Sequence, residues 1–223
     1  MMYLIRLVII KFNFMEKKMP DFVLEDSVKG IVAGVDEAGR GPWVGPVVAG
    51  CVVFLSREVN PFLLENLNDS KKISKKKREK LYEILLEERE KGNILAEVGV
   101  ASAKEIDEKN ILNATFEAMK RAISNTGVKP DLVLIDGNRV PKEFNYNAKA
   151  VVKGDAKSYS ISAGSIMAKV YRDKLMEEMA KVYPNYGFEK NAGYGTKEHI
   201  DALKKYGITP EHRKSYAPIK EFL

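Results

Sequence analysis

The chain has 223 residues, of which 45% are hydrophobic and 30% charged, a balance typical of a globular domain with its own core. Its net charge of +6 and its pI of about 9.1 are compatible with a polyanionic partner and argue against an acidic carrier. The single cysteine, Cys51, excludes a disulfide framework and a cysteine-based zinc site, and two histidines are too few for a histidine-rich metal cage. Because cysteine is so scarce, we expect a reducing, cytoplasmic location.

Residues 1–28 are set apart as an N-terminal arm. The stretch MMYLIRLVIIKFNFMEKKMP is apolar and basic, but its apolar run LVII is shorter than the core of a usual signal peptide, and no small-residue cleavage site follows. It is also far shorter than a membrane span, so we expect no membrane association. We interpret the arm as an upstream start, with Met15 or Met19 as the natural one, or as a short extra strand.

Apolar periodicity and turn residues predict the remaining elements. Strands are expected in five β-branched or apolar runs, at 30–35, 46–55, 93–103, 131–136 and 147–155. Helices are expected where apolar residues recur at helical spacing, at 74–90 with Ser74 as N-cap, 105–125, 158–184 and 196–207. Residues 56–73 are polar and rich in turn formers, which predicts a loop. Strands that first form hairpins and then alternate with helices indicate an α/β domain over 29–223 with a mixed sheet.

Acidic residues follow three of the predicted strands. Asp36 and Asp136 each end a strand, and Asp155 lies between a strand and the long helix. Sites in open α/β sheets collect beyond the carboxyl ends of strands, so neighbouring strands would bring Asp36 and Asp136 together. Carboxylates without histidine or thiolate favour Mg²⁺ or Mn²⁺, and pairs of such ions catalyse phosphodiester hydrolysis.

A simpler interpretation of each single aspartate is a turn former or a helix cap. The neighbours Asp36 and Glu37 raise a further question, because adjacent residues on a regular strand point to opposite faces. They can share one site only if the strand ends or twists there, for which the following glycines provide the freedom.

Five segments, in this order, resemble the ribonuclease HII family: VDEAGRGPWVGPVV, LNDSKKIS, LVLIDGN, VVKGDAKSYSISAGSIMAKVYRD and GYGTKEHIDALKKYGITPEHRKSY. The resemblance extends from about residue 29 to the C-terminus. It implies a ribonuclease H-like fold, an α/β fold with a central mixed β-sheet flanked by helices and a small helical C-terminal part. It also implies an endonuclease that cuts 5′ to a ribonucleotide, in RNA–DNA hybrids and in duplex DNA, leaving 3′-hydroxyl and 5′-phosphate ends.

The resemblance also implies roles for individual residues. Four acids would be both catalytic and metal-binding, holding Mg²⁺ or Mn²⁺ with two ions in the reacting complex: Asp36, Glu37, Asp136 and Asp155. The GRG segment would contact the ribose 2′-hydroxyl and adjacent phosphates through its backbone, which needs glycine for close approach: Gly39, Arg40 and Gly41. Tyr194 resembles the tyrosine that packs on the deoxyribose 3′ of the ribonucleotide.

Three basic residues are candidates for phosphate contacts, which set the register of a nucleic acid without reading its sequence: Lys71, Lys153 and Arg213. Serines at the start of the long helix suit either phosphate contacts or close packing: Ser158, Ser162 and Ser165. His199 and His212 are expected to be structural. Trp43 departs from the smaller aliphatic residue common at its place in the family.

Two other functions are compatible with the sequence. One is a ribonuclease HIII-like hybrid nuclease, although such enzymes carry an additional N-terminal substrate-binding domain and the arm here is too short to form one. The other is an inactive protein that binds RNA–DNA hybrids, although such a protein should have lost at least one of the four acids. We expect a monomer that binds RNA–DNA hybrids or ribonucleotide-containing duplex DNA.

Overall fold

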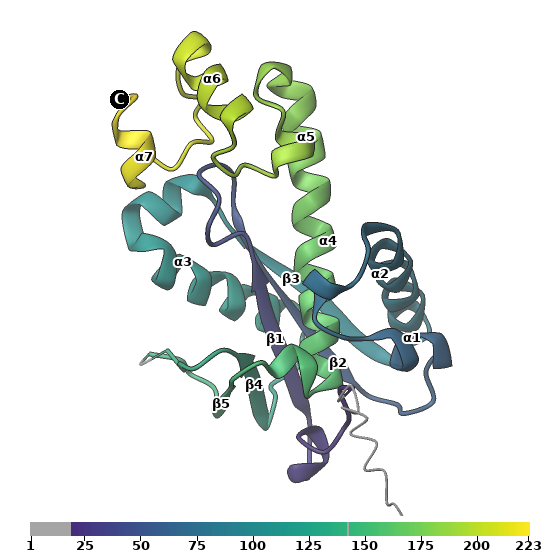
Figure 1. Ribbon diagram of the computed structural model, residues 1–223. Coiled ribbons are helices and arrows are strands. Elements are labelled where there is room, and N and C mark those ends of the chain that lie inside the picture. The colour runs from purple at the N-terminus through teal and green to yellow at the C-terminus, as the bar shows by residue number, and fades with distance from the viewer. Residues whose placement is uncertain (1–18, 142) are drawn as a thin grey trace, which may run out of the picture.

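A computed structural model describes residues 19–141 and 143–223 of the chain (Figure 1). Five strands form one sheet in the order β3-β2-β1-β4-β5. The central strand β1 (Val32–Ala38) pairs antiparallel with β2 (Val47–Phe54) and parallel with β4 (Leu132–Asp136). The edge strands are β3 (Ile94–Ala101), antiparallel to β2, and β5 (Ala148–Val151), parallel to β4. The expected mixed sheet is therefore confirmed, and its hairpin half and its parallel half meet at β1.

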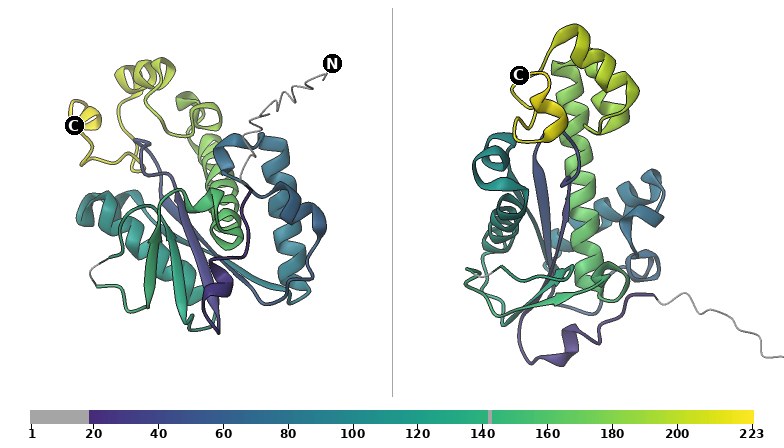
Figure 2. Two further views of the ribbon diagram at one scale, coloured as in Figure 1. Left: turned by 60° about the horizontal axis from the view of Figure 1, so that its bottom comes forward. Right: turned by 60° about the vertical axis from the view of Figure 1, so that its left-hand side comes forward.

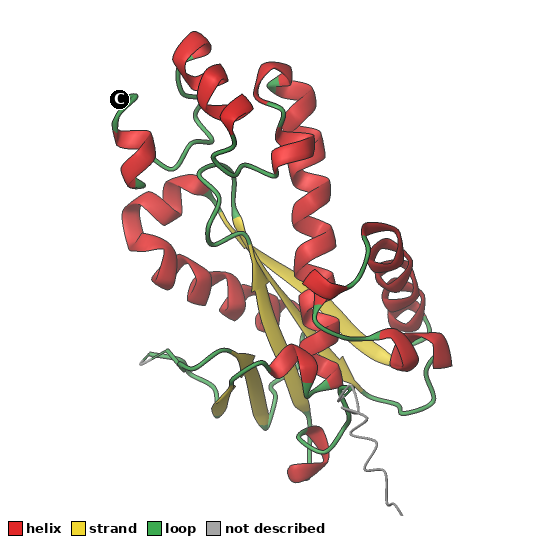
Figure 3. Ribbon diagram, in the orientation of Figure 1, coloured by secondary structure: helices red, strands yellow, loops and turns green. Residues whose placement is uncertain are grey.

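Helices cover both faces of this sheet (Figures 2 and 3). α3 (Ala103–Asn125) lies on one face, and α4 (Tyr159–Val182) crosses the other, with α2 (Lys75–Glu90) and α1 (Pro61–Asn66) beside it. The C-terminal helices gather near the far end of α4: α5 (Phe188–Asn191), α6 (Lys197–Tyr206) and α7 (Ala217–Lys220). Short 3₁₀ turns connect these elements: η1 (Glu25–Ser27), η2 (Ser70–Lys72), η3 (Gly154–Ala156) and η4 (Pro184–Tyr186).

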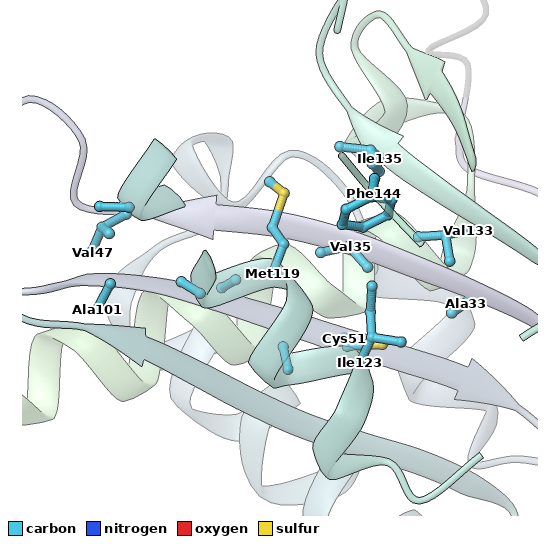
Figure 4. Close-up of a cluster of buried hydrophobic side chains, with 14 of the residues drawn as sticks. Ala33, Val35, Val47, Cys51, Ala101, Met119, Ile123, Val133, Ile135 and Phe144 are labelled. Carbon is cyan, nitrogen blue, oxygen red and sulfur yellow. The ribbon is translucent and has the colours of Figure 1, made fainter. Parts of the chain in front are cut away.

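The two faces of the sheet are packed differently. On the α3 face, side chains such as Val35, Ile135 and Met119 interlock in one apolar cluster (Figure 4). On the α4 face, glycines bring the helix almost onto the strands, since a Cβ on Gly50 would lie 2.1 Å from the Gly164 carbonyl oxygen. Close packing at this face fixes α4 against β1 and β2, and α4 in turn supports the residues at the ends of these strands.

Most predicted elements are found, and Ser74 caps α2 as expected. The loop predicted over 56–73 contains α1, where Pro61 begins the helix, Asn60 caps it and Leu63 is buried. Asn60 and Pro61, predicted to be turn formers, start the helix instead. With only six residues, α1 is too short to show an apolar helical repeat. The long helix α3 is kinked at Asn110, whose φ of 65° is not helical.

Of the N-terminal arm, residues 19–28 are described, and they pack against the α/β domain. The Phe22 ring contacts those of Phe54 and Tyr159, and the Arg57 guanidinium lies 3.9 Å from its centroid. The suggested start at Met15 lies outside the described residues. In the part of the chain that the structure describes, no helix is long and apolar enough to cross a membrane.

Candidate active site

Strand β1 carries the adjacent acids Asp36 and Glu37 on opposite faces of the sheet. Asp36 lies on the α4 face beside Ser165, whereas Glu37 lines a groove of about 340 Å³ on the α3 face. Pairing between β1 and β4 ends at Val35 and Ile135, so the edge of β1 next to both acids is open. The side chains approach this open edge from the two faces, and both interact electrostatically with the acid at the end of β4. The prediction that the first strand ends at Asp36 is wrong, because β1 continues to Ala38. The neighbouring strand β4 ends beside the acids instead, at Asp136.

That acid, Asp136, also anchors the segment that carries Asp155. Its Oδ1 accepts a hydrogen bond from the Gly154 backbone N–H at 2.6 Å. Lys153, one residue earlier, adopts the left-handed backbone conformation with φ 55°, which turns the chain from β5 into η3. Asp155 is thereby held close enough to Asp136 for their charges to interact. A backbone hydrogen bond, in addition to strand order, thus joins the third and fourth acids.

Burial and mutual repulsion both disfavour the charged forms of these acids. Burial, followed by the charges of Glu37 and Asp136, raises the pKa of Asp36 well above its usual value. Burial also raises the pKa of Glu37, and the Arg40 guanidinium, 3.3 Å from its Oε1, opposes the rise. The pKa of Asp155 is raised by burial and then by Asp136. Carboxylates that repel one another in this way are stabilised by a bound cation.

The donor set fits a hard divalent cation, since carboxylate oxygens are the ligands that Mg²⁺ and Mn²⁺ prefer. Within residues 19–141 and 143–223, no three histidine, cysteine or acidic side chains are close enough to hold an ion by themselves. Mg²⁺ usually retains several waters and uses one or two carboxylates together with substrate phosphates. The arrangement therefore suits an ion whose coordination is completed by water and substrate.

Lys71, an exposed residue of the turn η2, is brought to the acids. Its charge opposes the rise in the pKa of both Glu37 and Asp155. The preceding Asp69 is a further acid near Asp155, which the sequence interpretation did not include. Burial alone would raise its pKa, but hydrogen bonds, first from the Lys71 backbone N–H at 3.0 Å, outweigh burial and lower it. Asp69 thus holds the turn that presents Lys71 to the site.

Two buried arginines support the loop of residues 39–46, which follows β1. Arg213 uses all five N–H donors, at 2.6 to 3.2 Å, on oxygens of Gly39, Arg40, Gly45, Pro46 and the Tyr216 hydroxyl. Arg172 of α4 donates to the carbonyls of Pro46, Ala192 and Val44. Burial lowers the pKa of both arginines; that of Arg172 falls to about 10, mainly through burial and then through the positive charge of Arg213. The loop is therefore held through its carbonyl groups.

Anchoring these carbonyls sets the direction of the neighbouring amides. In a planar trans peptide the N–H points opposite to the C=O, so the N–H groups of Arg40 and Gly41 point away from Arg213. Neither N–H has an acceptor among the described residues, and both residues are exposed. Gly39 has φ 97°, and a Cβ there would lie 2.0 Å from Arg172 Nε. The loop therefore presents two free donors within four residues of Glu37.

Tyr194 is brought to the same loop from the C-terminal helices. The residue is 51% exposed, and a Cβ on Gly41 would lie 3.4 Å from the ring carbon Cε1. The Trp43 backbone N–H donates to the Gly193 carbonyl at 2.8 Å, which fixes this segment to the loop. The GRG segment and Tyr194 are therefore side by side, although 153 residues separate Gly41 from Tyr194 in the chain.

The position of Arg213 corrects its predicted role. A phosphate contact needs a guanidinium at the surface, whereas this one is buried with every donor used. The serines considered for phosphate contacts are also buried and bonded inside the protein: Ser158, Ser162 and Ser165. Lys153 is exposed next to Asp155, and its phosphate contact stays a prediction.

Sequence reasoning missed Arg172, although the pattern around it carried a signal. Ala168, Arg172 and Met176 are spaced four residues apart on α4, and all three are buried. An arginine on an apolar helix face is costly unless its donors are satisfied, so it indicates a specific set of buried acceptors. Here those acceptors are carbonyls of the loop beside the acids.

Comparison with known proteins identifies the family. The family model for ribonuclease HII matches residues 33–218. Ribonuclease HII of Wolbachia sp. subsp. Brugia malayi (strain TRS) is 50% identical over 200 residues, which cover 90% of this chain and 94% of the relative. The chain belongs to the ribonuclease HII family.

Solved structures agree with this assignment. Ribonuclease H2 from Pyrococcus horikoshii OT3 matches this member of the ribonuclease HII family with a TM-score of 0.70 and 29% identity, over 86% of this chain and 96% of that one. Bst-RNase HIII in complex with Mn²⁺ has a TM-score of 0.61 at 14% identity, over 86% and 68%, and shares the fold alone. The expected ribonuclease H-like fold is confirmed, and the protein is a ribonuclease H, a nuclease of the hydrolase class.

Proposed function

We propose that this ribonuclease HII cleaves the RNA strand of RNA–DNA hybrids and cuts 5′ of single ribonucleotides embedded in duplex DNA. The products would carry 3′-hydroxyl and 5′-phosphate ends. The observation that carries this proposal is that the free N–H groups of Arg40 and Gly41 lie only three and four residues after Glu37. The 2′-hydroxyl is the one group that distinguishes RNA from DNA locally. Because donors for the 2′-hydroxyl would lie next to the metal-binding acids, the enzyme would recognise the ribose at the bond that it cleaves.

Four acids would hold Mg²⁺ or Mn²⁺, with two ions in the reacting complex: Asp36, Glu37, Asp136 and Asp155. When bound, such ions lower the pKa of a water and stabilise the developing charge on the leaving oxygen. The support from this chain is the all-carboxylate donor set. Burial, and then repulsion from Glu37 and Asp136, raises the pKa of Asp36, as expected for a site that a cation would stabilise. The Mn²⁺ in the Bst-RNase HIII structure is consistent with such an ion.

Substrate recognition would be divided among three groups. The N–H groups of Arg40 and Gly41 would contact the ribose 2′-hydroxyl and the adjacent phosphates. The exposed ring of Tyr194 would pack on the deoxyribose 3′ of the ribonucleotide, where DNA resumes. Lys71 and Lys153, both exposed near Asp155, would contact phosphates and set the register.

Cleavage mapping on a DNA duplex with one ribonucleotide tests this proposal, with Mg²⁺ and Mn²⁺ supplied in turn. We expect one cut, immediately 5′ of the ribonucleotide, with a 3′-hydroxyl on the upstream product. Matched duplexes carry 2′-deoxy or 2′-fluoro at the same position and keep every phosphate, and they should remain uncut. Equal cutting of the 2′-fluoro duplex would contradict recognition of the 2′-hydroxyl by the GRG segment.

Two other outcomes would assign a different function. Cleavage of long hybrids but not of a single ribonucleotide, with either ion, would indicate ribonuclease HIII-like specificity. Salt-dependent binding of hybrid without any cleavage would indicate a binding protein. The same assay therefore separates the three functions considered for the sequence.

A further inference from the structure

The two histidines of the chain form a buried pair in the C-terminal region. His199 lies on α6, and His212 lies in the segment between α6 and α7. Both are almost fully buried, and their Nε2 atoms are 3.1 Å apart. Two imidazole nitrogens at this distance form a hydrogen bond only if one carries a proton and the other a lone pair. The proton positions in this pair are therefore constrained.

Two backbone groups decide where the protons lie. The Thr209 backbone N–H, which can only donate, is 2.8 Å from His212 Nδ1, so that nitrogen carries the lone pair. The His212 proton is then on Nε2 and is donated to Nε2 of His199. The remaining proton of His199 is on Nδ1, 2.9 Å from the Tyr194 carbonyl, which can only accept. Both imidazoles are neutral, and the hydrogen bonds run in one direction, from Thr209 to Tyr194.

The surroundings favour these neutral forms. Burial lowers the pKa of His199, and burial followed by the charge of His199 lowers that of His212 to about 4. An added proton would need a site that already accepts a hydrogen bond, either Nδ1 of His212 or Nε2 of His199. The pair can therefore stay intact only while both rings are uncharged.

The hydrogen bonds end at the residue that faces the GRG segment. The Tyr194 carbonyl accepts from His199 and from the Thr196 backbone N–H at 2.8 Å, while its own N–H donates to the Asn191 carbonyl at 2.9 Å. Its backbone is thus fixed on both sides, whereas its ring is half exposed beside Gly41. The position of the ring over the loop depends on where the backbone is held.

We propose that His199 and His212 are positioning residues that hold the Tyr194 ring against the GRG segment for the sugar at the RNA–DNA junction. This inference rests on the proposed function, in which Tyr194 packs on the deoxyribose 3′ of the ribonucleotide. Neither histidine touches the substrate. Their effect passes through the carbonyl of Tyr194.

Amide substitutions separate this role from general support of the fold. Asparagine places its polar atoms near Nδ1 of histidine, and glutamine places them near Nε2. His199→Asn keeps the donor to Tyr194, and His199→Gln loses it. At the other position the order is reversed, because His212→Gln keeps the donor to His199, whereas His212→Asn keeps only the bond to Thr209. Support of the Thr209 segment alone would predict that His212→Asn is the milder change.

Kinetics on the single-ribonucleotide duplex give the functional measurement, with Tyr194→Ala as the reference. We expect His199→Gln and His212→Asn to raise KM by about three- to tenfold, the effect of losing roughly one buried hydrogen bond, with little change in kcat. His199→Asn and His212→Gln should stay near the wild-type value. On the Tyr194→Ala background, His199→Gln should add nothing further. Equal losses in both members of either pair, or additive losses on that background, would overturn the inference.

A spectroscopic measurement on the free enzyme makes the two proposals separable. In protein with ¹⁵N-labelled histidine, the imidazole protons should be on Nδ1 of His199 and on Nε2 of His212 at neutral pH. In protein with ¹⁵N-labelled tyrosine, the Tyr194 amide signal should move in His199→Gln and stay in His199→Asn. A charged ring, the opposite tautomers or an unmoved Tyr194 signal would overturn the inference whatever the enzyme cuts. A wild-type enzyme that leaves the single-ribonucleotide duplex uncut would overturn the proposed function while the histidine signals stay as expected.

Discussion

The carboxylates at the end of the sheet and the histidine pair near the C-terminus both remove ionisable groups from water. In the histidine pair, all four ring nitrogens have partners, and burial lowers the pKa values so that the neutral forms persist. In the carboxylate cluster, burial and then neighbouring charges raise the pKa of Asp36. The first arrangement is complete within the protein, whereas in the second the charges of Arg40 and Lys71 only partly oppose the effects of burial and repulsion.

This difference distinguishes buried groups that stabilise the fold from buried groups that bind a ligand. A buried group that is fully hydrogen-bonded stabilises the fold in the state in which it is found. Buried groups of like charge destabilise the fold until something else neutralises them, which is common where a ligand binds. On this view the carboxylates should lose function and gain stability when neutralised, whereas the histidines should lose stability when charged.

The largest expected effect comes from neutralising the acids. Asp36→Asn and Asp136→Asn should each reduce kcat by more than the roughly 100-fold typical of an outer-sphere metal partner, because each removes a proposed ligand. Binding of hybrid should survive, since the phosphate contacts remain. Cleavage and hybrid-binding assays measure the two effects, and near wild-type cleavage by either variant would contradict the proposed site.

The same variants test the comparison through stability. In EDTA at neutral pH, Asp36→Asn should raise the unfolding temperature, because the amide removes a buried charge that burial and Glu37 disfavour. His212→Asn, which breaks a satisfied pair, should lower it. A lower unfolding temperature for Asp36→Asn would mean that the carboxylate, like the histidine pair, is already stabilised within the protein.

The next effect is on the buried Arg213, which resembles the histidines in that every one of its donors has a partner. Arg213→Lys should destabilise the protein by about 3 kcal/mol, since lysine has three donors on a single nitrogen and leaves loop carbonyls unsatisfied. Arg57→Lys is the matched control, because Arg57 is 46% exposed in its ion pair with Asp26 and should contribute less than about 1 kcal/mol. Denaturant unfolding measures both, and equal effects would show that the loop does not depend on Arg213.

The histidine pair and the carboxylates should also differ in how their contribution to stability depends on pH. His212 has a folded pKa of about 4 against about 6.5 when unfolded. The neutral His212 therefore contributes fully to the free energy of unfolding above pH 6.5. As the pH falls from 6.5 toward 4, the unfolded state takes up the proton first, and the protein loses up to about 3 kcal/mol of stability. The raised pKa of Asp36 acts with the opposite sign, because the folded state then binds the proton more tightly and gains stability as the pH falls.

Comparing wild type with His212→Gln isolates the histidine contribution, since both proteins keep the same acids. Between pH 7 and pH 4.5 the unfolding free energy of wild type should fall more steeply than that of the variant. Denaturant unfolding at several pH values measures the slopes. Parallel slopes would show that His212 takes up a proton as readily in the folded protein as in the unfolded chain.

The sequence predicted what depends on local pattern and missed what depends on packing. The five strands and the Ser74 cap follow from neighbouring residues and were found in the structure, although β1 continues to Ala38 and β5 ends at Val151. The way in which Asp36 and Glu37 share a site does not follow from β1, because it depends on β4 ending beside them. A property of a partner strand leaves no trace in the residues of the strand itself.

Charged residues were the hardest to assign for the same reason. Arg213 and Lys71 are both basic residues in family motifs, yet one is buried among carbonyls and the other is exposed near the acids. Only tertiary structure decides whether a cation faces the solvent or the backbone. The apolar neighbours of Arg172 on α4 carried a partial signal, whereas the segment around Arg213, PEHRKSY, has no such periodicity.

The smallest expected effect lies at the exposed rim of the carboxylate site. Lys71→Ala should raise KM a few-fold and reduce the slope of log affinity against log salt by about 1, as expected for one phosphate contact. Lys76→Ala is the matched control, because Lys76 is also exposed but lies on the first turn of α2. Binding of a ribonucleotide-containing duplex in the presence of Ca²⁺, measured at several salt concentrations, gives both slopes. If the two variants change the slope equally, Lys71 acts through net charge alone, and its position beside Glu37 and Asp155 has no part in binding.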